Sequence, residues 1–384
     1  MTKRLFDTDS HLLEFEACVL DVREGDGGFW VLLDETAFAP EAGGQPSDVG
    51  TLGEANVLDV REKDGELWHL IDREIVPNGT VVGKIDRFRR LRHLQNHTGE
   101  HIVTGLFHRE YGLNNVGFHL GHEDVTLDLD GCVEMSTVRQ IERLANIAVA
   151  ENRKVNILYP SDGELAALSY RAKGEIEGRV RLVEIEGLDL CACCVPHVKY
   201  TGEVGGIRLL SAMRYKGGTR IHMKCGLDAI AHGNIQEDRE SELSRLLSLP
   251  PERIVEGVRK LSEELGAVKY KIGQMKRERI SFLIDSFETK RKPSCLFESD
   301  FEVNELRMLA TGISEKTGRS CLAFSGDDEG GYRFVLSDAL SFEKTAAAFR
   351  AAFSPKGGGK PPVLQGTVNA TERELRAFFE TRIS

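Results

Sequence analysis

NHTGEHIVTGLF, at residues 96–107, carries two histidines, His97 and His101, four positions apart. The surrounding segment Phe88–Tyr111 reads as a helix, and side chains at positions i and i+4 of a helix project from the same face. One helix with this spacing can supply two ligands to a single zinc ion. The stretch therefore predicts a metal site on a helix, to which the rest of the fold must bring further ligands.

A second group of candidate ligands lies far downstream in CACCVPHV, where Cys193 and His197 are also four positions apart. Pro196 between them indicates a tight loop rather than a helix. Histidine nitrogens together with a cysteine sulfur suit a tetrahedral metal site. On spacing alone, Cys191 and Cys194 compete with Cys193 as the ligand and could instead form a redox pair.

The first stretch also allows a different enzyme class. His97-Thr98-Gly99-Glu100-His101 has the H-x-x-E-H pattern of inverted-zincin peptidases, in which the glutamate is the general base. This interpretation needs an acidic third ligand on another helix, and it leaves Cys193 and His197 unexplained. We therefore keep it only as an alternative.

The composition is that of an ordinary soluble protein with several domains. Of 384 residues, 41% are apolar and 29% are charged, and the chain is long enough for two or three cores. No apolar run reaches the length of a membrane span, about 18 residues, and the N-terminus lacks the apolar core of a signal peptide. Eight cysteines in this length do not make a disulfide scaffold, and three of them crowd together at Cys191, Cys193 and Cys194. We therefore expect a cytoplasmic protein without membrane contacts.

The net charge of −11 argues against nonspecific nucleic-acid binding by the whole surface, but two segments are basic. Lys84–Arg92 has five basic residues and one acid, net +4, and Lys269–Lys292 has eight basic residues and three acids, net +5. Patches of this kind can bind the RNA backbone, and the alternative is an ordinary solvated surface.

Residues 12–86 predict a small β-barrel or a curled antiparallel sheet. Alternating apolar stretches are separated by Asp26-Gly27, Asp64-Gly65 and Asn78-Gly79, dipeptides that favour tight hairpin turns. The expected strands are Glu14–Val22, Phe29–Leu33, Asn56–Arg61 and Thr80–Ile85.

Residues 88–225 predict a mixture of helices and strands. The helix at Phe88–Tyr111 is followed by a second at Thr137–Asn152, for which Ser136 is a candidate N-cap. Strand-like runs then follow at Val155–Tyr159, Val180–Ile185 and Ile207–Leu210.

Beyond Pro250-Pro251, which suits the first turn of a helix, apolar residues alternate spacings of four and three. This seam predicts a coiled coil or a helical hairpin, although a helix packed on its own domain remains open. The seam residues are Ile254, Val258, Leu261, Leu265, Val268, Ile272 and Met275.

The sequence therefore predicts a mixed α+β chain of four parts. These are a β-barrel subdomain at residues 1–87, a zinc-binding α+β domain at 88–232, a helical linker at 233–292 and a C-terminal α/β domain at 293–384.

Three motifs resemble, in order and separation, the editing domain of alanyl-tRNA synthetase and its free-standing AlaX-type relatives. They are PEAGGQPSDVGTL (40–52), NHTGEHIVTGLF (96–107) and CCVPHVKYTGEVG (193–205). KGGTRIHMKCG (216–226) is similar to the strand that closes that domain, and KGGGKPPVLQG (356–366) to the glycine-rich motif of the DHH-associated C-terminal domain. The resemblance covers essentially the whole chain and does not include the aminoacylation domain.

The resemblance implies a hydrolase that removes a wrongly attached amino acid from tRNA(Ala), serine above all and glycine next. It implies one zinc ion per chain, bound by His97, His101, Cys193 and His197. The zinc ion would either activate water or position the substrate. An inactive tRNA-binding protein of the same fold is a further alternative, against which the retained ligands count.

The candidate catalytic residues are Thr36, Gln45, His97 and His101. In the family, the position of Thr36 is proposed to hydrogen-bond the hydroxyl of misattached serine, so that alanine is spared. Glycines at 43 and 44 could bring backbone N–H groups close to the terminal nucleotide, because they lack Cβ.

Residues 250–384 are expected to grip tRNA and to form a homodimer. The candidate substrate-binding residues are Gly43, Gly44, Lys276, Arg277, Gly357, Gly358, Gly359 and Lys360.

Two departures from the family pattern stand out. The family usually has Cys-Gly-Gly-Thr-His where this chain has Cys193-Cys194-Val195-Pro196-His197, which keeps the two ligands and changes the residues that set the loop shape and the hydroxyl. Ala39 stands where an aromatic residue is common and Ala42 where glycine or serine is common, which could alter amino-acid specificity.

Overall fold

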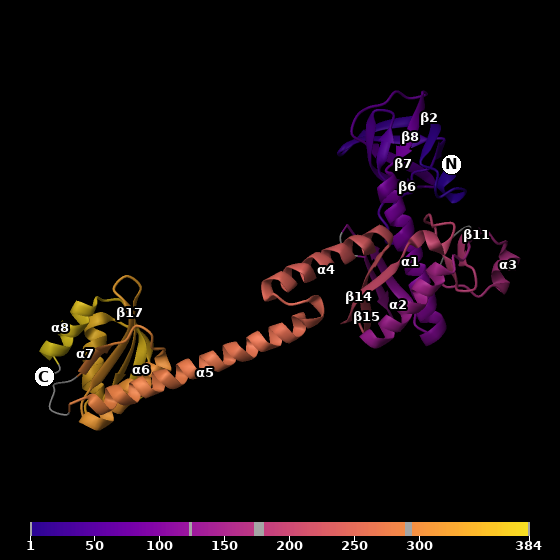
Figure 1. Cartoon of the computed structure of the whole chain (residues 1–384). Helices are drawn as coiled ribbons and strands as arrows, with labels where there is room; N and C mark the ends of the chain where they lie inside the picture. Colours follow the sequence, from indigo (N-terminus) through magenta and orange to yellow (C-terminus); the bar gives the residue numbers. More distant parts are fainter. Residues whose placement is uncertain (1, 123–124, 173–179, 289–293, 383–384) are drawn as a thin grey trace. The chain divides into compact units, whose positions relative to one another are not determined.

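The computed structural model describes residues 2–122, 125–172, 180–288 and 294–382, and the chain divides into two compact units, Met1–Glu242 and Leu243–Ser384 (Figure 1). Both units combine helices with sheets, which confirms the predicted α+β class. Over the described ranges, each helix is either too short or too polar to cross a membrane. The finer domain boundaries stay predictions.

The N-terminal part of the first unit is a closed barrel with the strand order β2-β3-β7-β6-β5-β8. Phe15, Ala17 and Val19 alternate along β2 and pack in the barrel core. Asp64 and Asn78 adopt positive φ angles of 54° and 59° in the turns, a conformation that these residue types tolerate. The strands are β2 (Glu14–Gly25), β3 (Gly28–Leu33), β5 (Gly50–Leu52), β6 (Ala55–Lys63), β7 (Glu66–Ile71) and β8 (Thr80–Ile85), and the short strands β1 (Lys3–Arg4) and β4 (Glu35–Thr36) pair with each other.

Helix α1 (Arg87–Tyr111) follows the barrel and packs against α2 (Met135–Ala150) and strand β15. The Asp86 carboxylate accepts hydrogen bonds from two backbone N–H groups of its first turn. The predicted N-cap of α2, Ser136, was wrong, because the helix begins after Glu134 and the serine lies inside its first turn. Met135 packs against the core, and the helix begins at this residue, one position before Ser136.

Two antiparallel sheets surround α1 and α2 in the first unit. A four-stranded sheet has the order β14-β15-β10-β9, and a three-stranded sheet has the order β11-β12-β13. Their strands are β9 (Asn115–Leu120), β10 (Val125–Leu129), β11 (Val155–Leu158), β12 (Leu182–Ile185), β13 (Asp189–Ala192), β14 (Ile207–Tyr215) and β15 (Gly218–Cys225), with helix α3 (Asp162–Ala167) after β11. The three predicted strand runs correspond to β11, β12 and the first half of β14.

The second unit is a five-stranded sheet, in the order β16-β17-β18-β20-β19, with helices on both faces. Helix α4 (Gly226–Leu247) precedes it, and the end of α5 (Ile254–Ser286) packs on the sheet through Ile280. The remaining elements are β16 (Ser294–Phe297), α6 (Val303–Thr317), β17 (Cys321–Asp327), β18 (Gly331–Ser337), α7 (Phe342–Phe353), β19 (Lys356–Gly358), β20 (Val363–Val368) and α8 (Glu372–Arg382).

The predicted seam of α5 is an exposed apolar stripe. Its residues from Val258 to Met275 each expose between 49% and 59% of their surface. An apolar stripe of this kind is what a coiled-coil partner would cover, and the partner itself stays a prediction.

A buried ion pair joins the barrel to α1. Arg90 and Asp48 are each 1% exposed, and the guanidinium also donates to the carbonyl oxygens of Ser10, at 2.8 Å, and Ala37, at 2.6 Å. Burial raises the pKa of Asp48, but the neighbouring Arg90 outweighs this and lowers the pKa to about 2. The pair therefore holds the segment that contains the glycine motif against the helix.

Replacement of Asp48 by Asn is expected to lower the free energy of unfolding by roughly 3–5 kcal/mol, because Arg90 is left buried without its counter-charge. Urea unfolding at pH 7 measures the loss. Asp21→Asn, which removes an exposed partner of Arg23, should cost less than about 1 kcal/mol. Equal losses in the two variants would contradict the argument.

The same pair predicts the direction of acid sensitivity. A carboxyl group whose folded pKa lies below its ordinary value stabilises the protein above that ordinary value. The contribution of Asp48 should therefore be complete above about pH 4 and lost as the pH falls toward 2. The stability difference between the wild type and Asp48→Asn should shrink over that range.

Candidate metal centre

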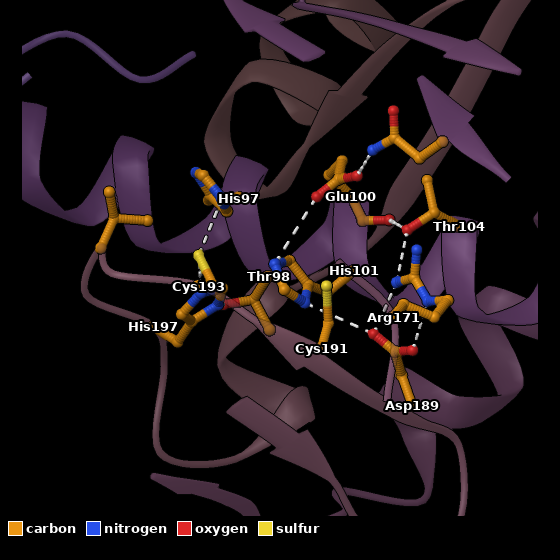
Figure 2. A network of polar contacts seen from close by, with 12 residues as sticks. His97, Thr98, Glu100, His101, Thr104, Arg171, Asp189, Cys191, Cys193 and His197 are labelled. Carbon is orange, nitrogen blue, oxygen red and sulfur yellow. Dashed lines mark hydrogen bonds and ion pairs between the residues drawn. The ribbon is translucent and has the colours of Figure 1, made fainter. Parts of the chain in front are cut away.

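The structure brings the four predicted ligands His97, His101, Cys193 and His197 together in the first unit (Figure 2). One donor atom from each lies within 4.8 Å of the others. Cys193 Sγ is 3.5 Å from His97 Nε2 and 3.4 Å from His197 Nε2. The helix α1 presents the first two ligands, and the loop after β13 presents the other two.

The spacing of these donors fits a tetrahedral metal ion. Bond lengths of about 2.0–2.1 Å to nitrogen and 2.3 Å to sulfur place adjacent nitrogen and sulfur ligands about 3.6 Å apart. The two distances from the Cys193 sulfur are close to this value, and the three histidines are buried. The residues therefore form a cradle for a divalent metal with three nitrogen donors and one sulfur donor.

A polar group also faces the second ring nitrogen of each histidine. His97 Nδ1 lies 3.1 Å from Gln45 Oε1, and His197 Nδ1 lies 3.2 Å from the Thr98 hydroxyl. His101 Nδ1 lies 3.4 Å from Asp189 Oδ2. A contact at Nδ1 helps to fix the ring, and the Nε2 atoms of His97 and His197 face the Cys193 sulfur.

The electrostatics of the site favour bound positive charge. Burial raises the pKa of the Cys193 thiol, but the imidazoles of His97 and His197 outweigh it and hold the pKa well below its usual range. Burial lowers the pKa of His197 to about 3, so this ring is neutral and keeps its lone pair. Burial also lowers the pKa of His101, but Cys191 and Asp189 outweigh it and raise the pKa well above its usual value, so a metal ion would have to displace a proton from this ring. Thiolate and neutral imidazole are the forms that bind metal.

The glycine motif reaches this centre from the barrel. Gln45 and Ala42 exchange backbone hydrogen bonds around a two-residue turn, in which Gly43 and Gly44 have φ angles of 59° and 80°. A Cβ on Gly43 would lie 3.4 Å from the His97 ring, and one on Gly44 only 2.1 Å from the Phe118 carbonyl oxygen. Gly43 therefore allows the turn to lie against His97, and Gly44 allows it to lie against β9.

Thr36 lies inside the barrel, where its hydroxyl is already engaged. The Phe38 N–H donates to Thr36 Oγ1 at 3.1 Å, and His69 Nε2 lies 2.9 Å from the same oxygen. His69 Nδ1 faces the Val31 carbonyl at 3.2 Å, which can only accept, so Nδ1 carries the proton and Nε2 accepts from Thr36. One lone pair of the Thr36 hydroxyl is left to accept a further hydrogen bond.

The predicted substrate-binding residues of the second unit lie at separate places within it. Gly357 and Gly358 belong to the edge strand β19, which pairs with β20, and Lys360 is exposed just beyond Gly359. Lys276 contacts the Asp300 carbonyl oxygen and lies 3.1 Å from the Glu305 carboxylate, whereas Arg277 is exposed. Lys290–Lys292 fall outside the described residues.

In both basic segments, several of the cations form ion pairs with acids that lie elsewhere in the fold. In the first, Lys84, Arg90 and Arg92 form ion pairs with Glu14, Asp48 and Asp228. In the second, Arg279 pairs with Glu298 and Asp300. Any phosphate contact by these cations would have to compete with the acids already present.

Sequence reasoning missed the residues behind the ligands. Asp189 lies on β13 beside His101, and Arg171 reaches it from the segment before β12. Glu100 of the H-x-x-E-H pattern lies 3.7 Å from His101 Nε2, and its other oxygen contacts Asn115. Cys193 and His197 complete the four-donor set that the peptidase interpretation left unexplained. No local spacing marks Arg171 or Asp189.

Gly44→Ala is expected to destabilise the protein more than a positive φ angle alone would require. Gly27→Ala is the matched control, because Gly27 has a φ of 88° and an added Cβ there would meet nothing within 4 Å. The control should lose about 1–2 kcal/mol through backbone strain, and Gly44→Ala a further 1–3 kcal/mol or so through contact with the Phe118 backbone. Urea unfolding compares the two, and equal losses would mean that the turn does not press against β9.

The chain is similar in sequence to proteins of known families. Residues 180–222 match the family described as the threonyl and alanyl tRNA synthetase second additional domain. The chain is 30% identical to the alanine-tRNA ligase of Pyrococcus furiosus, over 99% of this chain and 43% of that protein. It thus spans less than half the length of the alanine-tRNA ligases that it matches.

Shorter relatives match over most of their own length. The alanyl-tRNA editing protein AlaX-M of Methanosarcina mazei is 37% identical, over 54% of this chain and 90% of that protein. The alanyl-tRNA editing protein Aarsd1-B of Xenopus laevis is 28% identical, over 93% of this chain and 89% of that protein. The chain therefore belongs to the AlaX-type family of alanyl-tRNA editing proteins.

Proposed function

We propose that the protein is an aminoacyl-tRNA deacylase that hydrolyses the ester of mischarged tRNA(Ala), Ser-tRNA(Ala) first and Gly-tRNA(Ala) next. The observation that carries the proposal is the convergence of the Gly43-Gly44 turn on the four-donor centre of His97, His101, Cys193 and His197. The names of the editing relatives support the same activity.

We propose zinc as the metal, one ion per chain, because three imidazoles and one thiolate at tetrahedral separations suit it. Zinc in this site would supply Lewis-acid stabilisation of the charge that develops on the ester carbonyl oxygen. An inactive tRNA-binding protein would have no need of a retained, buried donor set.

The glycine turn and Gln45 have different tasks in this proposal. Gly43 and Gly44 present bare backbone beside His97, where the terminal ribose and its ester can approach closely. Gln45 is 1% exposed and accepts from His97 Nδ1–H, so it orients the ligand instead of touching substrate. His97 and His101 serve as ligands.

Thr36 is proposed to read the hydroxyl of serine with the lone pair that His69 and Phe38 leave open. The serine hydroxyl would donate to Thr36 Oγ1, because the Thr36 proton is already given to His69. Alanine offers no such donor and would be spared.

His101→Ala is expected to remove bound zinc and deacylation together while the second unit stays folded. His108→Ala, an exposed histidine on the same helix, should change neither. Zinc analysis of the purified protein and release of serine from Ser-tRNA(Ala) are the two measurements. Zinc without deacylase activity in the wild type would favour the tRNA-binding alternative, and cleavage in a peptide panel would favour the peptidase.

Thr36→Val should reduce the preference for Ser-tRNA(Ala) over Ala-tRNA(Ala) by roughly 1–3 kcal/mol, the value of an unmade buried hydrogen bond. Thr36→Ser keeps the hydroxyl and should keep most of the preference. The ratio of kcat/KM for the two substrates is the readout. If both variants keep the wild-type ratio and only lose stability, the hydroxyl serves His69 and Phe38 alone.

The second unit is proposed to dimerise and to hold tRNA. The exposed stripe of α5 offers an apolar face for a second copy, whereas a simple spacer helix would not need one. Leu265→Glu on the stripe should yield monomers in sedimentation, and Tyr270→Glu off the stripe should not. A monomeric wild type would contradict this assignment. Lys276, Arg277, Lys360 and the Gly357–Gly359 segment are the proposed tRNA contacts.

A further inference from the structure

Among the three candidate histidine ligands, His101 differs in the group that faces its Nδ1 atom. The Nδ1 atoms of His97 and His197 face neutral oxygens, whereas His101 Nδ1 faces the Asp189 carboxylate (Figure 2). The side chain of Asp189 is only 3% exposed, so this charge lies inside the protein. A buried carboxylate is costly unless it is paired, so its presence here needs an explanation.

Arg171 holds that carboxylate from behind. Its Nε donates to Asp189 Oδ1 and its Nη2 to Oδ2, both at 2.7 Å. Nη2 also lies 3.0 Å from the hydroxyl of Thr104, one turn after His101 on α1. Two parallel contacts from one planar guanidinium fix the rotation of a carboxylate, and a lysine could not reproduce them.

The backbone of Arg171 is itself anchored beside β13. Its N–H donates to the Leu190 carbonyl and its carbonyl accepts from the Ala192 N–H, both at 2.8 Å. Side chain and backbone therefore bind the same short strand that carries Asp189. The pair is a rigid support and stands directly behind a metal ligand.

We propose that Arg171 and Asp189 are positioning residues for His101, and this inference rests on the metal site proposed above. The carboxylate accepts the Nδ1 proton, which sets the ring so that Nε2 faces the metal, and Arg171 keeps the carboxylate in that orientation. Within the described residues, His101 Nδ1 makes no hydrogen bond of full geometry, and its 3.4 Å ion-pair contact with Asp189 Oδ2 is the contact on which the proposal rests.

Two other roles for Asp189 make different predictions. The residue could be a metal ligand, because His101, Asp189 and Cys191 also place donor atoms within 4.8 Å of one another. Arg171 occupies both carboxylate oxygens, which disfavours that role. The pair could also be a purely structural tie between α1 and β13, in which case its loss would leave the metal geometry unchanged.

The test uses the full chain, stripped of metal and titrated with Co²⁺ against a competing chelator. Asp189→Asn should weaken Co²⁺ binding by about 10- to 100-fold and change the visible absorption of the bound ion. Asp128→Asn is the matched control, because Asp128 has the same two-bonded pairing with Arg220, at 2.7 Å and 2.7 Å, elsewhere in the unit. It should leave affinity and spectrum unchanged.

Arg171→Lys keeps a positive charge and tests the same idea if Asp189→Asn does not fold. It should bind Co²⁺ more weakly than the wild type and less weakly than Asp189→Asn. Wild-type affinity and an unaltered spectrum in both variants would overturn the positioning role and leave the metal site intact. A wild-type protein that binds no Co²⁺ or Zn²⁺ would instead remove the metal site itself, and this inference with it. If the wild type bound two Co²⁺ ions and Asp189→Asn bound only one, Asp189 would be a ligand of the second ion, and the positioning role would be overturned.

Discussion

Helix α1 is buried from His93 to Phe107 and yet is rich in polar side chains, and this conflict determines how the first unit is built. A buried polar group needs a partner, and several of those on α1 tie the helix to other elements. Gln95 and Asn96 bind backbone groups at Leu227 and Cys225, after and at the end of β15. Arg90 binds the barrel, and Thr98 binds the loop of the second pair of ligands at the Val198 N–H.

Close backbone approach makes these ties feasible. A Cβ on Gly99 would lie 2.3 Å from the sulfur of Cys225, so β15 can approach α1 only where the helix has no side chain. Because Gly99 lies between His97 and His101, the same stretch supplies the metal ligands and the contact surface for the sheet. The packing of α1 on the sheet and the placement of the two histidines thus depend on the same turn of the helix.

Local signals in the sequence predicted several strands and helices of the first unit and singled out the candidate ligands, but the choice of Cys193 over Cys191 and Cys194 came from the family resemblance. The tight turns of the barrel, the two four-residue spacings and the apolar stripe of α5 all follow from neighbours in the chain. The start of α2 was missed because packing of Met135, a tertiary effect, moved it. Arg171 and Asp189 were missed because a pair separated by a loop leaves no periodic pattern. Charge counting within a segment could not reveal ion pairs for a related reason, since Arg279 pairs with acids from elsewhere in the fold.

The second ligand loop is supported by contacts from other elements. Pro196 offers no hydroxyl, and the Thr98 hydroxyl of α1 lies 3.2 Å from His197 Nδ1. The loop also lacks the family's glycines, and Arg181 supports it by donating to the carbonyl oxygens of Cys193, at 2.7 Å, and Val195, at 3.0 Å. The position of the sulfur ligand therefore depends on contacts from α1 and from the residue before β12 more than on the residues of the loop itself.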